Sequence, residues 1–210
     1  RPRLDVARAR GFSQSVGSAH ETAALEAALE RAIQGNGQVV GVVGEAGVGK
    51  RRLCYEFIQG CRDRGLTVTE AHGVAHGKTI PFLGVLEYLR NYFGTTDQDT
   101  EQSAREKIAG KVVLLDPELN DALPLLFDFL GVPDPERPVQ RMDPEARQRQ
   151  LFAAMKRITH AQGRREPTLA VIEDLQWIDA GSEAFLENFV EALAGTRHLL
   201  VVNFRPEYHA

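Results

Sequence analysis

Apolar residues recur along the chain in two alternating patterns, one at helical spacing and one as short continuous runs. In residues 20–34 they return every three or four positions, and Gly35-Asn36-Gly37 ends the pattern, which predicts an amphipathic helix. Residues 38–43 form a valine-rich run typical of a buried strand, and a glycine loop and a helical stretch over residues 49–64 follow. The beginning of the chain therefore predicts a strand, a loop and a helix in succession.

The same alternation continues to the end of the chain. Further strands are predicted at residues 66–71, 168–172 and 198–204, and helices at residues 81–93, 101–115, 120–130 and 182–193. Another helix is predicted to begin at Asp143, with Ile158 on its apolar face. Prolines at 133, 135 and 138 predict a surface linker before the helix that begins at Asp143-Pro144-Glu145. Strands that alternate with helices favour an α/β fold with a parallel sheet covered on both faces.

Composition and charge narrow the class of protein. The 210 residues are 43% hydrophobic and 26% charged, and we expect a lead-in over residues 1–19 and one core domain over residues 20–210. The formal charge of −4 argues against nonspecific nucleic-acid binding, and the apolar runs are too short to span a membrane. Cys54 and Cys61 lie on one predicted helix, roughly 10 Å apart, too far for a disulfide. A cytoplasmic location is expected.

The glycine loop at residues 44–50 carries the strongest chemical signal. Its sequence, GEAGVGK, fits the pattern GxxxxGK and lies between a predicted strand and a predicted helix. Glycines let the backbone N–H groups of such a loop wrap around phosphate oxygens, and Lys50 adds a positive charge for the outer phosphates. The alternative is an ordinary glycine turn, which the flanking strand and helix disfavour.

Arg51 departs from this motif. A Ser or Thr normally follows the lysine and binds magnesium through its hydroxyl, whereas a guanidinium group repels the metal. We expect nucleotide to bind with part of its charge neutralised by Arg51, and hydrolysis to be impaired.

Two acidic residues and one arginine follow other predicted strands. Glu173 and Asp174 end the strand at residues 168–172, where one acid could hold magnesium and the other orient the attacking water. Arg205 follows the last strand, at the edge where parallel sheets place their ligands, and could sense the terminal phosphate. The alternatives are a solvated acidic turn and an exposed arginine before Pro206.

Three segments resemble a known family. GEAGVGKRRL, LAVIEDLQWIDAGS and LLVVNFRPEY look like the STAND branch of AAA-related ATPases, as found in LuxR-type regulators and beside class III adenylate or guanylate cyclase domains. The resemblance implies a three-layer P-loop NTPase fold with strand order 1-4-3-2. It also implies that a fifth strand, a lid and a winged helix lie outside these 210 residues.

The resemblance also assigns roles to residues. It makes Glu173 and Asp174 the Walker B pair, which binds the metal and acts in catalysis, and Arg205 the sensor. The residues expected to bind nucleotide are Val16, Gly17, Gly44, Glu45, Ala46, Gly47, Val48, Gly49, Lys50, Arg51 and Arg52. Ser18 and Gln176 depart from the family, which usually has arginine and histidine at these positions.

These features predict an ATP-driven switch with ATP or ADP and Mg²⁺ as its ligands. Attached effector and sensor domains and a nucleotide-dependent homo-oligomer are its expected partners, with no membrane and no direct nucleic-acid contact. The alternatives are a non-hydrolysing nucleotide-binding or scaffolding module, favoured by Arg51, and a small-molecule kinase. His72 and His76 have the spacing of metal ligands on a helix, but Gly73 and Gly77 disfavour a helix there, so no zinc site is predicted.

Overall fold

One parallel sheet forms the centre of the protein, whose structure is a computed structural model that describes residues 19–208. Within those residues the sheet has four strands in the order β1-β4-β3-β2. They are β1 (Gln38–Val43), β2 (Thr67–His72), β3 (Thr168–Glu173) and β4 (His198–Phe204). All three neighbouring pairs run parallel, so the predicted α/β class and the order 1-4-3-2 are confirmed.

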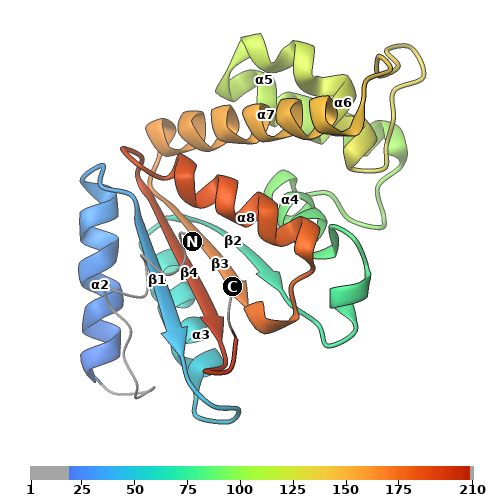
Figure 1. Ribbon diagram of the computed structural model, residues 1–210. Helices are drawn as coiled ribbons and strands as arrows, with labels where there is room; N and C mark the ends of the chain where they lie inside the picture. Colours follow the sequence, from blue (N-terminus) through green and yellow to red (C-terminus); the bar gives the residue numbers. More distant parts are fainter. Residues whose placement is uncertain (1–18, 209–210) are drawn as a thin grey trace.

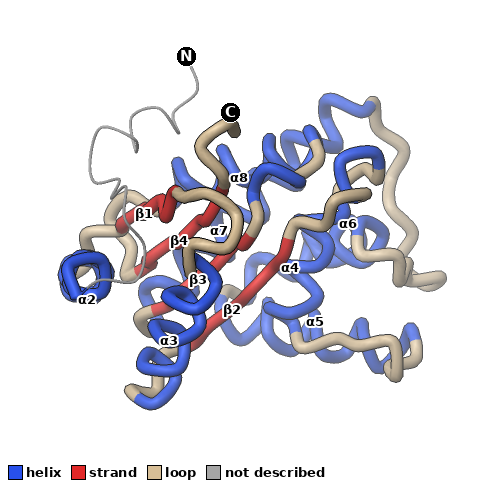
Figure 2. Tube along the Cα trace, turned by 90° about the horizontal axis from the view of Figure 1, so that it is seen from below, coloured by secondary structure: helices blue, strands red, loops and turns tan. Residues whose placement is uncertain are grey.

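Helices cover both faces of this sheet (Figures 1 and 2). α2 and α3 lie on one face, whereas α8 and α4 lie on the other, with α7 beyond them. The bounds are α2 (Ala19–Ile33), α3 (Lys50–Asp63), α4 (Leu83–Phe93), α5 (Glu101–Leu115), α6 (Leu123–Phe129), α7 (Pro144–Arg165) and α8 (Ala180–Ala192), with short 3-10 turns η1 (Gly77–Thr79), η2 (Pro117–Ala122) and η3 (Leu175–Trp177). The result is a layered fold of helices, sheet and helices.

The alternation of side chains along each strand divides the core. Leu169 and Val171 of β3 point toward α2 and α3, whereas Ala170 between them packs against the side of α8. β4 repeats this pattern with Leu199 on the first side and Leu200 on the second. Because successive side chains of a strand point to opposite faces, nearly continuous apolar strands are what a sheet covered on both sides requires.

A second core joins the helices that connect β2 to β3. α5, α6 and η2 pack with α7 and α4 around a separate apolar cluster that includes Ile108, Val112 and Leu126, each 1% exposed or less. Figure 1 shows α5, α6 and α7 at the end of the molecule beyond α8, whereas α4 lies beside α8. The long insertion between β2 and β3 is therefore a packed helical unit, as its apolar periodicity predicts.

The predicted helix over residues 120–130 is interrupted in the structure. η2 ends at Ala122, and α6 begins at Leu123 with Pro124 in its first turn. Proline has no N–H to donate and its ring clashes with the preceding turn, so it begins a new helix instead of continuing the old one.

Two further sequence expectations can be compared with the described chain. Cys54 and Cys61 are both free and buried. No helix in residues 19–208 has the length and apolar character needed to cross a membrane.

Candidate nucleotide-binding site

The carboxyl ends of the four strands lie along one edge of the sheet, and the predicted site residues follow them. The loop of residues 44–50 follows β1, Asp174 follows β3 and Arg205 follows β4. The loop and the acidic pair come from β1 and β3, which are separated in the sheet by the single strand β4. The order of the strands thus brings together residues separated by more than 120 positions in the chain, and ligands of parallel sheets bind at such crevices.

The loop has the backbone geometry that its glycines allow. Gly47 and Gly49 have φ angles of 83° and 96°, a left-handed region that strongly favours glycine. Gly49 is the N-cap of α3 and supplies no side-chain capping bond. The first N–H groups of a helix have no partner within the helix, so the start of α3 offers donors to an anion.

Lys50 lies beneath this loop. Its ammonium group donates hydrogen bonds to the carbonyl oxygens of Gly44 and Glu45, the latter at 2.7 Å, and the residue is only 8% exposed. Burial lowers the pKa of Lys50, while the charge of Asp174 opposes this shift. A buried cation held by two carbonyl groups is well placed to exchange them for phosphate oxygens, which carry a full negative charge.

Glu173 and Asp174 differ in their surroundings. Glu173 ends β3 and is 4% exposed, and burial raises the pKa of its carboxyl group. Asp174 has a left-handed φ of 54°, and its backbone N–H donates to Oδ1 of Asn203 at 2.7 Å. A left-handed aspartate costs of order 1 kcal/mol, so neighbouring contacts must hold this turn in place.

Asn203 of β4 is a contributor that sequence reasoning missed. Besides accepting from Asp174, its amide donates to Sγ of Cys54 on α3 at 3.5 Å, so it links the acidic turn to the helix behind the loop. The residue is 2% exposed. The one indication in the sequence was its side-chain amide, which interrupts the apolar residues near the end of the run HLLVVNF.

Arg51 forms ion pairs with both acidic residues. Its guanidinium group lies 3.4 Å from Glu173 and 3.0 Å from Asp174, and its side chain is 76% exposed. A phosphate chain fits the loop, because its donors are backbone N–H groups and an ammonium group. Magnesium does not fit the usual position, because its hydroxyl ligand is replaced by a cation that already contacts both carboxylates.

Arg205 lies at the same edge. Its backbone N–H donates to Oε1 of Gln176 at 3.3 Å, and its guanidinium carbon is 5.8 Å from the ring centre of Trp177. Its charge contributes to lowering the pKa of Lys50, so its field reaches the loop. Its sensor role stays a prediction, as do the catalytic and metal-binding roles of the acidic pair and the nucleotide contacts of Gly44 to Arg52. Val16 and Gly17, predicted beside the adenine, lie outside the described residues.

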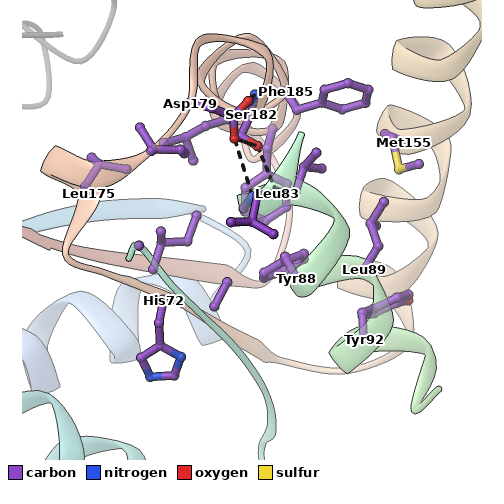
Figure 3. Close-up of a pocket in the computed structure, with 18 of the residues that line it drawn as sticks. His72, Leu83, Tyr88, Leu89, Tyr92, Met155, Leu175, Asp179, Ser182 and Phe185 are labelled. Atoms are coloured by element: carbon purple, nitrogen blue, oxygen red, sulfur yellow. Dashed lines mark hydrogen bonds between the residues drawn. The ribbon is translucent and has the colours of Figure 1, made fainter. Parts of the chain in front are cut away.

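An apolar cavity of about 100 Å³ lies behind the acidic turn (Figure 3). It is enclosed by α4, α7, α8 and the ends of β2 and β3, and its lining is mostly aliphatic and aromatic. The carboxylate of Asp179 at its rim already accepts from Ser182 and from the N–H of Phe82. Because this carboxylate is already paired and the lining is mostly apolar, the cavity does not offer the set of donors that a phosphate chain needs.

Two comparisons place the chain among known proteins. A family model described as an AAA ATPase domain matches residues 14–202. The chain is also similar to an uncharacterized protein of Rhizobium meliloti (strain 1021), with 27% identity over 190 residues that cover 84% of the chain. The chain spans only 17% of the length of that relative.

Proposed function

The chain belongs to the AAA ATPase domain family, and from this premise we propose that it binds ATP or ADP through the loop of residues 44–50. The observation that carries the proposal is the geometry of the loop. Two left-handed glycines precede a helix whose N-cap makes no side-chain capping bond, and a buried lysine lies beneath them. These groups together form a site for a chain of phosphates.

Different groups of the loop contact different parts of the phosphate chain. The N–H groups at the start of α3 face the phosphate oxygens, and Lys50 leaves the carbonyl groups of Gly44 and Glu45 to pair with the outer phosphates. The guanidinium group of Arg51 can move from its two carboxylate partners toward the bound phosphates, because its side chain is exposed. Binding therefore changes the ion pairs between α3 and the end of β3.

We further propose that this change makes the domain a switch within a longer signalling protein. The short share of the Rhizobium meliloti protein that the chain covers supports a domain of a larger chain. The resemblance to STAND ATPases favours attached sensor and effector domains, and a homo-oligomer that forms with nucleotide. Residues 20–210 would be the nucleotide-binding core, in the reducing cytoplasm where Cys54 and Cys61 stay free.

A second candidate function is a nucleotide-binding module without turnover. The ion pairs of Arg51 with Glu173 and Asp174 favour it, because both carboxylates already have a cationic partner. Phosphate release by the wild-type protein with ATP and Mg²⁺ separates the two functions. Turnover that EDTA abolishes supports the hydrolysing switch, and its absence supports the module.

Replacement of Lys50 tests nucleotide binding. Lys50→Ala and the more isosteric Lys50→Met remove the charge-assisted bonds to phosphate, worth about 3 kcal/mol, and we expect ATP affinity in calorimetry to fall roughly a hundredfold. Lys78→Ala is the matched control, because Lys78 is exposed in η1 away from the loop. Circular dichroism verifies that each variant is folded. Unchanged ATP affinity in both folded Lys50 variants contradicts the proposed function.

A further inference from the structure

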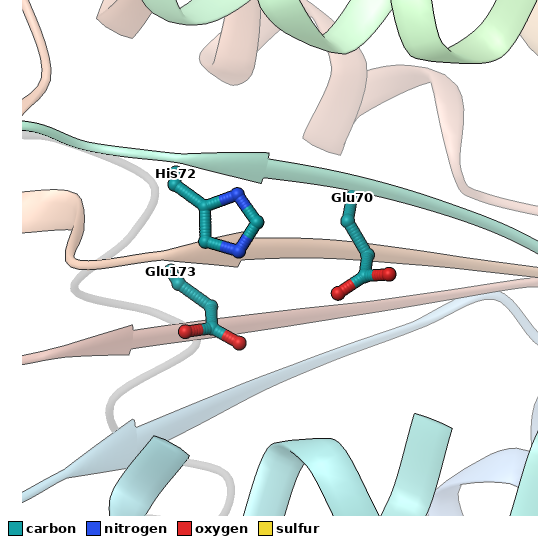
Figure 4. A group of neighbouring side chains, drawn as sticks. All are labelled: Glu70, His72 and Glu173. Carbon is teal, nitrogen blue, oxygen red and sulfur yellow. The ribbon is translucent and has the colours of Figure 1, made fainter. Parts of the chain in front are cut away.

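A second cluster of metal-ligating side chains lies next to the candidate nucleotide site. Glu70 and His72 are two residues apart on β2, and His72 is directly paired with Glu173 on β3. The three side chains therefore lie on the same face of the sheet, and Figure 4 shows them turned toward one another. One potential ligand atom from each lies within 4.8 Å of the others.

Glu87 of α4 orients the histidine. Its carboxylate lies 3.3 Å from Nδ1 of His72 and also accepts the backbone N–H of His72 at 3.1 Å. With Nδ1 bonded to this carboxylate, Nε2 is the nitrogen left for a metal, and it faces the carboxylates of Glu70 and Glu173 (Figure 4). A carboxylate that fixes the ring through one nitrogen while the other binds the metal is a recurring arrangement in zinc proteins.

The charges around the cluster favour a cation. Its nearest carboxylates are those of Glu70, Glu87, Glu173 and Asp174, whereas the guanidinium groups that contact them are those of Arg51 and Arg62. These contacts leave an excess of negative charge, only part of which the ammonium group of Lys50 offsets through Asp174, so a divalent cation is favoured here. Because each carboxylate has two oxygens, Glu70 and Glu173 can bind an ion with one and keep their arginine with the other.

We propose that Glu70, His72 and Glu173 bind a divalent first-row transition-metal ion such as Zn²⁺. One imidazole nitrogen with two carboxylates suits Zn²⁺ better than Mg²⁺, which takes oxygen ligands. Ligand atoms lie roughly 2 Å from bound zinc, so small rotations of Glu70 and His72 bring the three into range. The site needs no nucleotide. Its residues lie on β2 and β3, with β4 between them and β1, the strand that leads into the loop, and it shares Glu173 with the acidic pair of the nucleotide site.

Zinc titration of untagged protein against a chromogenic chelator tests the site. We expect one Zn²⁺ per chain, not displaced by a tenfold excess of Mg²⁺. His72→Asn keeps a donor for Glu87 but removes Nε2, and Glu70→Gln removes a carboxylate, so each is expected to weaken Zn²⁺ at least about tenfold. The matched control is His76→Asn, because His76 is exposed and outside the cluster. Thermal unfolding in EDTA verifies that the variants are folded.

The outcomes separate this site from the nucleotide site. Lys50→Ala is expected to retain zinc binding while it loses ATP, because Lys50 belongs to the nucleotide site alone whereas Glu173 belongs to both. The metal proposal is overturned if the wild type binds no Zn²⁺, if folded His72→Asn binds it as tightly as the wild type, or if His76→Asn loses it equally.

Discussion

The two ends of the sheet both carry polar side chains, but they use them in opposite ways. At the amino ends of the strands, Gln162, Thr168 and His198 are each 2% exposed or less, and their bonds join neutral groups for the most part. At the carboxyl ends, Asp174 has a left-handed backbone, and Arg51 beside it is largely exposed. The polar groups at the amino end are mostly neutral and bond to one another, with the carboxylate of Glu166 among their partners, whereas the carboxyl end carries paired charges and a strained turn.

The difference shows which polar residues serve the fold and which are available for a ligand. The amide of Gln162 joins the hydroxyl groups of Tyr92 and Thr168, so α7, α4 and β3 depend on it. Among the described residues, no buried side-chain nitrogen or oxygen lacks a partner. We therefore expect changes at the amino ends to alter stability, and changes at the carboxyl ends to alter ligand binding or turnover.

The largest expected effect concerns His198 and acid. Burial, with a smaller contribution from the charge of His160, lowers the pKa of His198 from 6.5 to about 4. Between these values the unfolded chain binds a proton that the folded protein excludes, so stability is full above pH 6.5 and falls as the pH drops toward 4. The loss attributable to His198 is expected to reach about 3 kcal/mol.

Urea unfolding at pH 7.5 and pH 4 measures this loss. His198→Asn removes the titrating group, so its stability is expected to depend less on pH than that of the wild type, whatever its stability at pH 7.5. His76→Asn removes an exposed histidine and is expected to keep the wild-type dependence. Equal pH dependence of wild type and His198→Asn would show that His198 is accessible to protons in the folded state.

The amino-end network also shows the limit of sequence reasoning. Apolar periodicity and the turn residues predicted every strand and most helix bounds, because these depend on neighbours in the chain. Gln162 and Tyr92 are 70 positions apart, and nothing in either segment indicates that they bond. Such pairs depend on how α4 and α7 pack, and that is a property of the whole fold.

The second prediction concerns Arg51 at the carboxyl ends. Arg51→Ser supplies the hydroxyl that the motif lacks and frees Glu173 and Asp174 from a guanidinium group. We expect Mg²⁺-dependent phosphate release to rise at least tenfold, which corresponds to about 1.4 kcal/mol in activation free energy. Stability is expected to change by less than about 1 kcal/mol, because the ion pairs of this exposed side chain are weak.

Arg64→Ser is the matched control for this prediction. Arg64 caps the opposite end of α3 from the loop and pairs with Glu26 and Glu30 of α2. Its replacement is expected to leave phosphate release unchanged. If Arg51→Ser stays as inactive as the wild type while it still binds ATP, the block to hydrolysis lies elsewhere than at this position.

The carboxyl-end site was only partly predictable. The loop and the acidic pair were identifiable because each motif is local, and the resemblance supplied the order of the strands. The contacts of Arg51 with both acids and the link through Asn203 could not be predicted from local sequence, because they depend on the position of β4 between β1 and β3. His72 was set aside with His76 because Gly73 and Gly77 disfavour a helix there. Its neighbour Glu173 was not predictable, because the register of β2 and β3 brings them together.

The smallest expected effect on stability comes from Asp174. Asn is among the residues that best tolerate a left-handed φ, so Asp174→Asn keeps the turn and the N–H bond to Asn203 while it removes one charge. We expect the free energy of unfolding to change by less than about 0.5 kcal/mol. Any phosphate release that the wild-type or Arg51→Ser protein shows is expected to fall at least tenfold, since the carboxylate can no longer accept a proton.

Asp179, five residues further along, provides the contrast that this prediction needs. Its buried carboxylate caps α8 through Ser182 and accepts the N–H of Phe82. Asp179→Asn replaces one accepting oxygen with an NH2 group, which cannot accept these bonds. We expect the free energy of unfolding in urea to fall by about 2 kcal/mol. Replacing aspartate by asparagine at these two positions would thus distinguish a carboxylate that acts in turnover from one that stabilises the fold. If Asp174→Asn destabilised the protein as much as Asp179→Asn, Asp174 would be a structural residue, and the acidic pair would lose its place in the proposed mechanism.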